Sequence, residues 1–273
     1  MLNKHAIMVI GHGNDASVLQ ETINILDDPQ IDFFIHWDKK FVRPKLFSNK
    51  SKIFFVNSIE VTWGTDSQME AELILLKAIQ KHSGYTMAHL ISSADMPLMD
   101  KDYFLNYFSD GRSYLGFAEG PSNISKDNIE RIKFYWPKIG LRNHHLLSRA
   151  IRIYGRLFHV NRLRNKNLTV CKGPNWFSIN TNLIPKVLHA DKNPFMHSFC
   201  VDEIFMQTIL SELYVSTKKD DNAQAARYID WKRGQPYTFS LSDVKELQKV
   251  KNTDYAFARK VNDRSLIQDV FRN

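Results

Sequence analysis

The clearest indication of architecture in this chain is Ala6-Ile7-Met8-Val9-Ile10-Gly11-His12-Gly13-Asn14-Asp15. The uninterrupted apolar run predicts a short buried strand, and the glycines that follow it predict a turn. A periodic stretch from Ser17 to Leu26 comes next and predicts a helix. The order strand, turn, helix is typical of an α/β domain.

The same order recurs through the first half of the chain. Further strands are expected at residues 31–36, 53–56 and 86–92. Apolar residues recur at helical spacing before the last of them, at Met69, Leu73, Leu76 and Ile79. This alternation predicts a mostly parallel central sheet flanked by helices. Ligands bind such sheets beyond the carboxyl ends of the strands, here near 11–14, 36–38 and Asp95.

The second half of the chain is less regular. Strands are expected at 114–118, 176–179 and 227–231, and helices at 184–189, 202–213 and 243–250. No repeat, low-complexity tract or linker divides the sequence. We therefore expect a single domain over residues 1–273.

Composition excludes several classes of protein. Hydrophobic residues make up 43% of the 273 residues, which argues against global disorder. Cys171 and Cys200 are the only cysteines, too few for a secreted disulfide framework, so a reducing compartment is expected. No apolar run approaches the roughly 20 residues that cross a bilayer. The expected location is cytoplasmic, without a membrane anchor of the chain's own.

Positive charge is unevenly distributed over this chain of net charge +8. The segment Arg142–Lys166 carries arginines interleaved with apolar residues and contains no acid. Such a basic amphipathic segment can lie on an anionic membrane surface, and peripheral association with the inner membrane face is one expectation. A solvated charged face is the alternative. Nucleic acid is not an expected partner.

Two adjacent carboxylates, Asp202 and Glu203, lie within the otherwise apolar stretch 199–210. An acid in apolar surroundings is costly unless it is paired, hydrogen-bonded or used. Such surroundings also raise its pKa and make it a better proton acceptor near neutral pH. The alternative is a helix start, with Asp202 as the N-cap and Glu203 near the positive end of the helix dipole. The residues alone leave both interpretations open.

Other motifs argue against common cofactors. Gly11-His12-Gly13 lacks the third glycine of a dinucleotide fingerprint, and no Walker sequence or metal-binding Cys/His spacing occurs. Asp100-Lys101-Asp102 matches the Asp-x-Asp metal motif of many sugar-nucleotide transferases. It stands at the start of an expected helix, so we predict that it caps that helix.

A series of short motifs connects the chain to a known family. In order, they are Ile35-His36-Trp37-Asp38-Lys39-Lys40, Val61-Thr62-Trp63-Gly64, Leu90-Ile91-Ser92-Ser93-Ala94-Asp95-Met96-Pro97-Leu98, Gly173-Pro174-Asn175-Trp176-Phe177-Ser178, Asp202-Glu203-Ile204-Phe205, Thr208-Ile209-Leu210, Arg227-Tyr228-Ile229-Asp230-Trp231 and Phe257-Ala258-Arg259-Lys260. With these motifs the chain resembles the core-2/I-branching β-1,6-N-acetylglucosaminyltransferases (glycosyltransferase family 14), which are related to peptide O-xylosyltransferases. The resemblance extends from about Ala6 to about Val261.

The resemblance implies a GT-A-like nucleotide-sugar-binding fold and inverting transfer from a UDP-sugar, with no bound metal or other cofactor. The expected sugar is N-acetylglucosamine. The resemblance places the general base on Glu203 and diphosphate binding on Lys260, with Arg259 beside it. A second basic contact is expected earlier in the chain, and the candidates are Arg227, Lys232 and Arg233.

The chemistry supports these assignments. A sugar hydroxyl is a poor nucleophile, so a carboxylate must take its proton during attack. Inversion needs one such base opposite the leaving group. The leaving diphosphate gains charge in the transition state, and Lys and Arg can stabilise it where no metal is present.

The remaining site residues are expected around the same cleft. His36 and Asp38 follow a buried strand and would contact uridine or ribose, with turn chemistry as the alternative. Asp95 would bind sugar or acceptor hydroxyls and is a rival candidate for the base. Trp63 on the donor side and Trp176 on the acceptor side offer flat faces to sugars, although tryptophan is as common in a core.

The two halves of the domain are assigned different roles. Residues 1–110 would bind the nucleotide, and residues 111–273, with Asp202 on the acceptor side, would bind the acceptor and catalyse transfer. The acceptor would be a glycan, glycoprotein or lipid-linked saccharide, and the product a cell-surface glycan. The cysteine pattern and N-terminal anchor of animal members are missing, so their acceptor is not carried over and a bacterial member is expected. The alternatives are a metal-dependent transferase using Asp100 and Asp102, or a non-catalytic carbohydrate- or membrane-binding protein.

Overall fold

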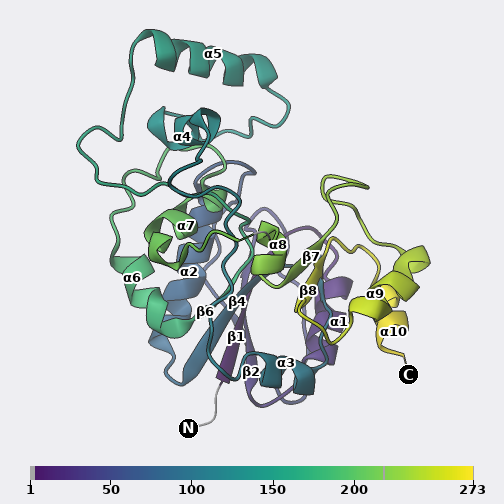
Figure 1. Ribbon diagram of the computed structural model, residues 1–273. Coiled ribbons are helices and arrows are strands. Elements are labelled where there is room, and N and C mark those ends of the chain that lie inside the picture. Colours follow the sequence, from purple (N-terminus) through teal and green to yellow (C-terminus); the bar gives the residue numbers. More distant parts are fainter. Residues whose placement is uncertain (1–3, 218, 273) are drawn as a thin grey trace.

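A five-stranded sheet forms the centre of the protein in the computed structural model, which describes residues 4–217 and 219–272 (Figure 1). The strand order is β3-β2-β1-β4-β6. The strands are β1 Lys4–Gly11, β2 Ile31–Trp37, β3 Ile53–Phe55, β4 Tyr85–Ser92 and β6 Ser178–Asn180. The first four are parallel, and β6 runs antiparallel to β4. The predicted α/β fold with a mostly parallel sheet is confirmed.

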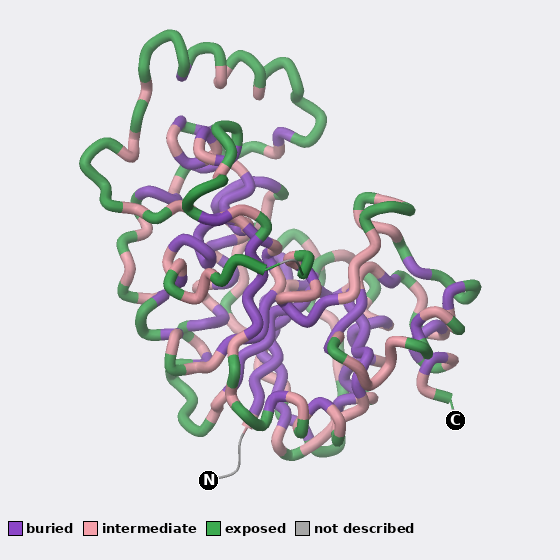
Figure 2. The backbone as a smooth tube through the Cα atoms, in the orientation of Figure 1, coloured by how far each residue is buried: buried purple, intermediate pink, exposed green. Residues whose placement is uncertain are grey.

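The central strands are apolar on both faces because helices cover both sides of the sheet. Every residue of β2 is buried, and in β1 successive side chains alternate between two separate cores. Met8 packs with Phe34 in one core, whereas Ile7 and Val9 belong to the other. In Figure 2 these strands form the buried centre of the molecule.

Helices on each face supply the apolar partners of the sheet. α2 Ser67–Lys81, α6 Ile184–His189 and α7 Phe205–Ile209 pack on the face that contains Met8. α1 Ser17–Ile25 and α3 Lys101–Tyr107 contribute to the opposite core. The predicted helices at 17–26, around 69–79 and at 184–189 are confirmed.

A small second sheet brings the two halves of the chain together. Its order is β5-β8-β7, with β5 Asp95–Pro97, β8 Phe257–Arg259 and β7 Arg227–Ile229. β5 pairs antiparallel with β8, which sets Asp95 opposite Arg259. α9 Val244–Val250 and α10 Arg264–Phe271 pack beside it around Leu247, Leu266 and Ile267. Both sheets therefore combine strands from the early and late parts of the chain.

Two further helices lie beyond the carboxyl ends of the parallel strands. They are α4 Lys126–Lys133 and α5 His145–Leu157, and in Figure 1 α5 stands apart from the rest of the fold. The remaining short helices are α8 Asp221–Gln224 and the 3-10 turns Thr181–Leu183, Val201–Glu203, Ser211–Leu213 and Leu241–Asp243. Among the described residues, no helix combines the length and the apolar character that crossing a membrane requires.

Two sequence-based expectations are wrong. The predicted helix at 202–213 is broken into a 3-10 turn, the short α7 and a second 3-10 turn. The predicted strand at 114–118 is reduced to bridges at Tyr114 and Glu119. Between them, a Cβ on Gly116 would lie 1.9 Å from the backbone oxygen of Asp221, so close packing of the chain against α8 displaces a regular ladder.

Candidate active site

The carboxyl ends of β1 and β2 are joined at one edge of the central sheet. The Asp38 backbone N donates to the Gly11 oxygen at 2.8 Å, and a Cβ on Gly11 would lie 2.2 Å from the Trp37 ring. Only glycine permits this approach. The buried Asp38 carboxylate accepts from the Lys40 backbone N at 3.0 Å and lies 3.3 Å from its Nζ. Asp38 thus lies at the expected edge, where both contacts stabilise a turn.

His36 does not reach the surface of this edge. It is fully buried, and its Nε2 accepts a hydrogen bond from the Ile59 backbone N at 3.0 Å. Burial lowers the pKa of His36, which favours the neutral ring that this bond requires. The expected contact of His36 with uridine or ribose is therefore not supported. Its ring holds the loop that leads to Trp63.

Asp95 and Arg259 form an ion pair across the small sheet. Arg259 Nη1 lies 2.6 Å from Asp95 Oδ1 and 2.6 Å from Ser92 Oγ. The second Asp95 oxygen accepts from the Ser92 backbone N at 2.7 Å. Both carboxylate oxygens are engaged and the side chain is buried, so Asp95 positions Arg259, and its expected contact with sugar or acceptor hydroxyls is not supported.

Arg259 in turn lies on Trp176. Its guanidinium carbon is 4.2 Å from the centroid of the half-buried indole ring, within the range of a cation–π contact. One face of Trp176, which was expected to receive a sugar, is therefore covered by Arg259. The residue acts as a support for the cation.

Lys260 follows Arg259 and is half-buried at the same edge. Burial lowers the pKa of its ammonium, and the positive charges of Arg259 and Arg142 act in the same direction, against the pull of Asp95. Within residues 4–217 and 219–272, no carboxylate forms a salt bridge with its Nζ. A half-buried cation without a counter-ion is a position at which a ligand anion would be stabilised.

His12 lies close to Lys260, in the turn after β1. Burial lowers its pKa first and the charge of Lys260 second, with Arg259 and Lys40 adding to the effect and Asp38 opposing it. No sequence motif assigns a role to His12. Its position directly after a parallel strand was the available signal. We call Arg142, Arg259 and Lys260 the cationic cluster; His12, whose lowered pKa favours the neutral ring, lies beside it.

Trp63 connects the cationic cluster with the segment that carries the adjacent acids. Its ring is 48% exposed, lies 5.7 Å from the Arg142 guanidinium carbon and meets Phe199 edge-to-face at 6.0 Å. The Cys200 backbone N donates to the Gly64 oxygen at 2.8 Å. The Trp63 loop therefore borders both groups, and Trp63 retains an exposed face for a ligand.

Glu203 presents a carboxylate held by two cations. Its Oε2 lies 2.7 Å from Arg131 Nη1 and 3.6 Å from Lys172 Nζ. Among the described residues no hydrogen bond or ion pair is made by its other oxygen, Oε1. The side chain is 36% exposed, so the expectation of an apolar environment is wrong for Glu203. Oε1 is nevertheless free to accept a proton from a ligand.

Asp202 occupies the apolar environment instead. Its side chain is buried, and Oδ2 accepts from Gln68 Nε2 at 3.2 Å. Burial, with Glu203 adding to it, raises the pKa of Asp202 to about 7. The fully buried Glu72 of α2 lies nearby, and burial raises its pKa further with the help of Asp202. Asp202 thus faces the interior, which contradicts its expected contact with the acceptor.

Arg227 is a structural residue. It is 1% exposed, and its guanidinium donates to the backbone oxygens of Leu90 at 3.0 Å and Phe177 at 2.7 Å, which ties β4 to β6. Burial lowers its pKa to about 9. Because Arg227 is enclosed by the two sheets, its expected role as a diphosphate contact is wrong.

Arg233 is committed to acids of its own region. Its guanidinium pairs with Asp230, with Asp243 at 2.9 Å and with Glu246 at 2.7 Å. A guanidinium with three carboxylate partners has little remaining capacity for a diphosphate, so its expected donor contact is not supported. Lys232 is exposed beside it, and no contact of its side chain places it in the cationic cluster.

The Asp-x-Asp motif performs the predicted capping role. Asp100 is the N-cap of α3 and accepts from the Tyr103 backbone N at 2.9 Å, while its other oxygen accepts from Asn252 Nδ2 at 2.6 Å. In the part of the chain that the structure describes, no group of three or more His, Cys, Asp or Glu side chains could hold a metal ion.

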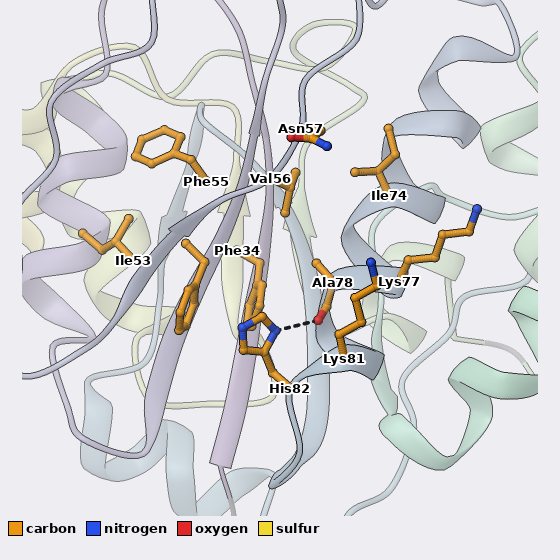
Figure 3. A pocket seen from close by; sticks show the side chains of 11 residues that line it. Phe34, Ile53, Phe55, Val56, Asn57, Ile74, Lys77, Ala78, Lys81 and His82 are labelled. Carbon is orange, nitrogen blue, oxygen red and sulfur yellow. Dashed lines mark hydrogen bonds between the residues drawn. The ribbon is translucent and has the colours of Figure 1, made fainter.

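An apolar groove lies elsewhere on the protein. It has a volume of about 540 Å³ and lies between β3 and α2, lined by Phe34, Phe54, Ile74 and His82, with Lys77 and Lys81 at its rim (Figure 3). His82 Nδ1 is 2.8 Å from the Ala78 oxygen within α2. None of the predicted site residues lines this groove.

The site therefore contains residues that the sequence did not identify. Arg131 and Lys172 hold Glu203, Arg142 extends the cationic cluster, and His12 lies beside it. Lys172 directly precedes the Gly173 motif, and Arg142 had been assigned to a membrane-facing segment; no sequence pattern indicated Arg131. The arrangement can bind a polyanion at the cationic cluster and accept a proton at Glu203 Oε1.

Comparison with known proteins identifies the family. The family model of the core-2/I-branching enzymes matches residues 5–251 of the chain. The match includes the central sheet, Glu203 and Arg227, and ends before Arg259 and Lys260. No curated protein matches the chain.

Proposed function

The chain belongs to the core-2/I-branching enzyme family, which is a glycosyltransferase family, and we propose that it is an inverting, metal-independent transferase that uses a UDP-sugar. The mixed α/β architecture with a mostly parallel sheet fits a GT-A-like fold. The proposed sugar is N-acetylglucosamine, and the acceptor is a glycan or glycoconjugate. A nucleotide-sugar donor and a glycan acceptor are what membership of this family implies.

The diphosphate of the donor would bind at the cationic cluster. Lys260 lacks a carboxylate partner among the described residues, and this is the observation that carries the proposal. Arg259 is fixed beside it by Asp95 and Trp176, so its charge is held in place before a ligand arrives. As the bond to the sugar breaks, the diphosphate gains negative charge, and cations held in place stabilise it without reorganising.

Glu203 would act as the general base. Arg131 and Lys172 contact only Oε2, so they orient the carboxylate while Oε1 receives the proton of the acceptor hydroxyl. Proton transfer would therefore depend on placing the hydroxyl within hydrogen-bond distance of Oε1.

Trp63 stands between these two groups and supports the assignment of a sugar position. Its exposed ring borders Arg142 on one side and Phe199, four residues before Glu203, on the other. Indole faces suit the apolar side of a sugar ring. We assign the transferred sugar to this space, between the diphosphate and the base.

We further propose that the enzyme works in the cytoplasm, at the inner face of a membrane. Cys171 and Cys200 are both free and buried, which fits a reducing compartment.

Incubation of the purified protein with a panel of UDP-sugars tests the function. Slow hydrolysis of one donor, unchanged by EDTA, is the expected result. Glu203→Gln should lower that rate by about 100-fold or more, the usual contribution of a general base. Glu212→Gln, at an exposed glutamate paired with Lys186, is the matched control.

Two other outcomes would favour the alternatives. Loss of hydrolysis in EDTA with recovery in Mn²⁺ would favour a metal-dependent transferase, although Asp100 is already engaged as a helix cap. Absence of UDP binding in calorimetry would favour a non-catalytic carbohydrate-binding protein.

A further inference from the structure

α5 turns an apolar stripe toward solvent. Leu146, Ile153 and Leu157 recur at positions i, i+7 and i+11 of the helix, so they share one face. They are 85%, 55% and 67% exposed, respectively. Tyr154 and Phe158 extend the same surface. In Figure 2 most residues of α5 are coloured as exposed.

The inner side of α5 fixes the helix to the protein. Gly155 lies so close to Phe134 that a Cβ would be 2.7 Å from its ring. Arg152 and Arg156 lie 2.9 and 2.8 Å from the carboxylate oxygens of the buried Glu130 in α4. The opposite face of α5 is already packed and paired, so the apolar stripe remains exposed to solvent. This is unusual for a surface helix, which normally buries its apolar face.

An apolar hollow continues the stripe at the base of α5. It has a volume of about 280 Å³ and is lined by Ala150, Ile151, Tyr154 and Gly155 of the helix, with Phe134 and Tyr135 opposite. Hydrocarbon chains can occupy such a space, since it offers few polar groups.

The charge around the stripe argues for an anionic partner. Residues 142–166 contain seven arginine and lysine side chains and no acid. Arg149 and Arg164 form no salt bridge with any described residue. A second copy of the chain docking through this face would bring two such segments together, so self-association is disfavoured by repulsion. An apolar stripe flanked by unpaired arginine matches the interface of a bilayer that contains anionic lipid.

We propose that the outer face of α5 docks the protein on an anionic membrane surface. The inference rests on the proposed function, because it names the surface at which the enzyme would operate. The geometry that supports docking does not depend on that function. α5 lies beyond the carboxyl ends of the parallel strands (Figure 1). Arg142 lies three residues before α5 and contacts Trp63, so the docked face adjoins the space assigned to the transferred sugar.

Vesicle co-sedimentation tests the proposal with the full-length protein. The probe is phosphatidylcholine vesicles with and without phosphatidylglycerol. The expected result is binding at least about 10-fold stronger to the anionic vesicles, weakened by salt. The variant Leu146→Ser/Ile153→Ser/Leu157→Ser should reduce this binding at least about 10-fold. The matched control Phe47→Ser/Val215→Ser/Leu241→Ser removes three exposed apolar residues elsewhere and should bind as the unmodified protein does.

Folding and function are followed separately. Circular dichroism spectra and rates of UDP-sugar hydrolysis in solution should be the same for the α5 variant and the unmodified protein. The substituted side chains lie on the exposed face of α5. Equal vesicle binding by the α5 variant and the unmodified protein would overturn the proposal. A dimer that light scattering detects in the unmodified protein but not in the α5 variant would also overturn the proposal. Vesicle binding that depends on the stripe, in a protein with no hydrolytic activity, would support docking and refute the proposed function alone.

Discussion

Replacing Lys260 by methionine should weaken UDP binding without weakening the fold. Methionine keeps much of the side-chain length and removes the charge. A hydrogen bond to a charged group contributes about 1.5–3 kcal/mol, which corresponds to a roughly 10- to 150-fold loss of affinity. Stability should stay equal or rise slightly, because burial and the charges of Arg259 and Arg142 already disfavour the ammonium of the free protein.

Calorimetric titration with UDP measures the first effect, and urea unfolding measures the second. Lys249→Met provides the control, since Lys249 is exposed on α9 away from the cationic cluster. An affinity of Lys260→Met for UDP within twofold of the unmodified protein would refute the reasoning. A large loss of stability would also contradict it, because the cation would then be a structural partner.

Three further perturbations test the assignments of buried and paired groups. In Glu72→Gln, stability should depend less on pH. Burial raises the folded-state pKa values of Glu72 and Asp202, so the unmodified protein loses stability, on the order of 3 kcal/mol, as pH rises from the usual carboxylate range through about 7. Urea unfolding between pH 5 and 8 measures this slope, and an unchanged slope in the variant would contradict a raised pKa of Glu72. Arg227→Ala should lower the free energy of unfolding by about 3 kcal/mol or more, because several backbone oxygens lose a buried donor. A variant that is stable but binds UDP more weakly would instead support Arg227 as a diphosphate contact. Arg233→Ala should leave UDP affinity within twofold and change stability only slightly, because its ion pairs are partly exposed; the same titration and unfolding experiments measure both. A 10-fold loss of affinity would be inconsistent with its placement.

The regular part of the fold could be predicted from periodicity. The runs at 6–10, 31–36 and 86–92 became β1, β2 and β4, because strands covered by helices on both faces are continuously apolar. β5 and β8 could not be found this way. Each has three residues and exists through pairing between Asp95 and Arg259, which are far apart in the sequence.

The site was predicted in its type of chemistry but not in its details. The edge near Gly11 and Asp38 followed from the rule for parallel sheets, whereas Lys260 followed from the family resemblance. Asp202 and Glu203 are adjacent, so the sequence did not show which of the two acids would be buried. The 3-10 turn at 201–203 directs Asp202 inward and leaves Glu203 facing Arg131. The arginine roles were wrong for a related reason, since sequence does not show that Arg227 lies between two sheets.

The crystal structure of the protein with UDP is the most direct measurement of the central claim. The account predicts the diphosphate against Lys260 and Arg259, with the open side of its terminal phosphate directed past Trp63 toward Glu203 Oε1. UDP in the groove between β3 and α2, or bound with its diphosphate remote from Lys260, would contradict it.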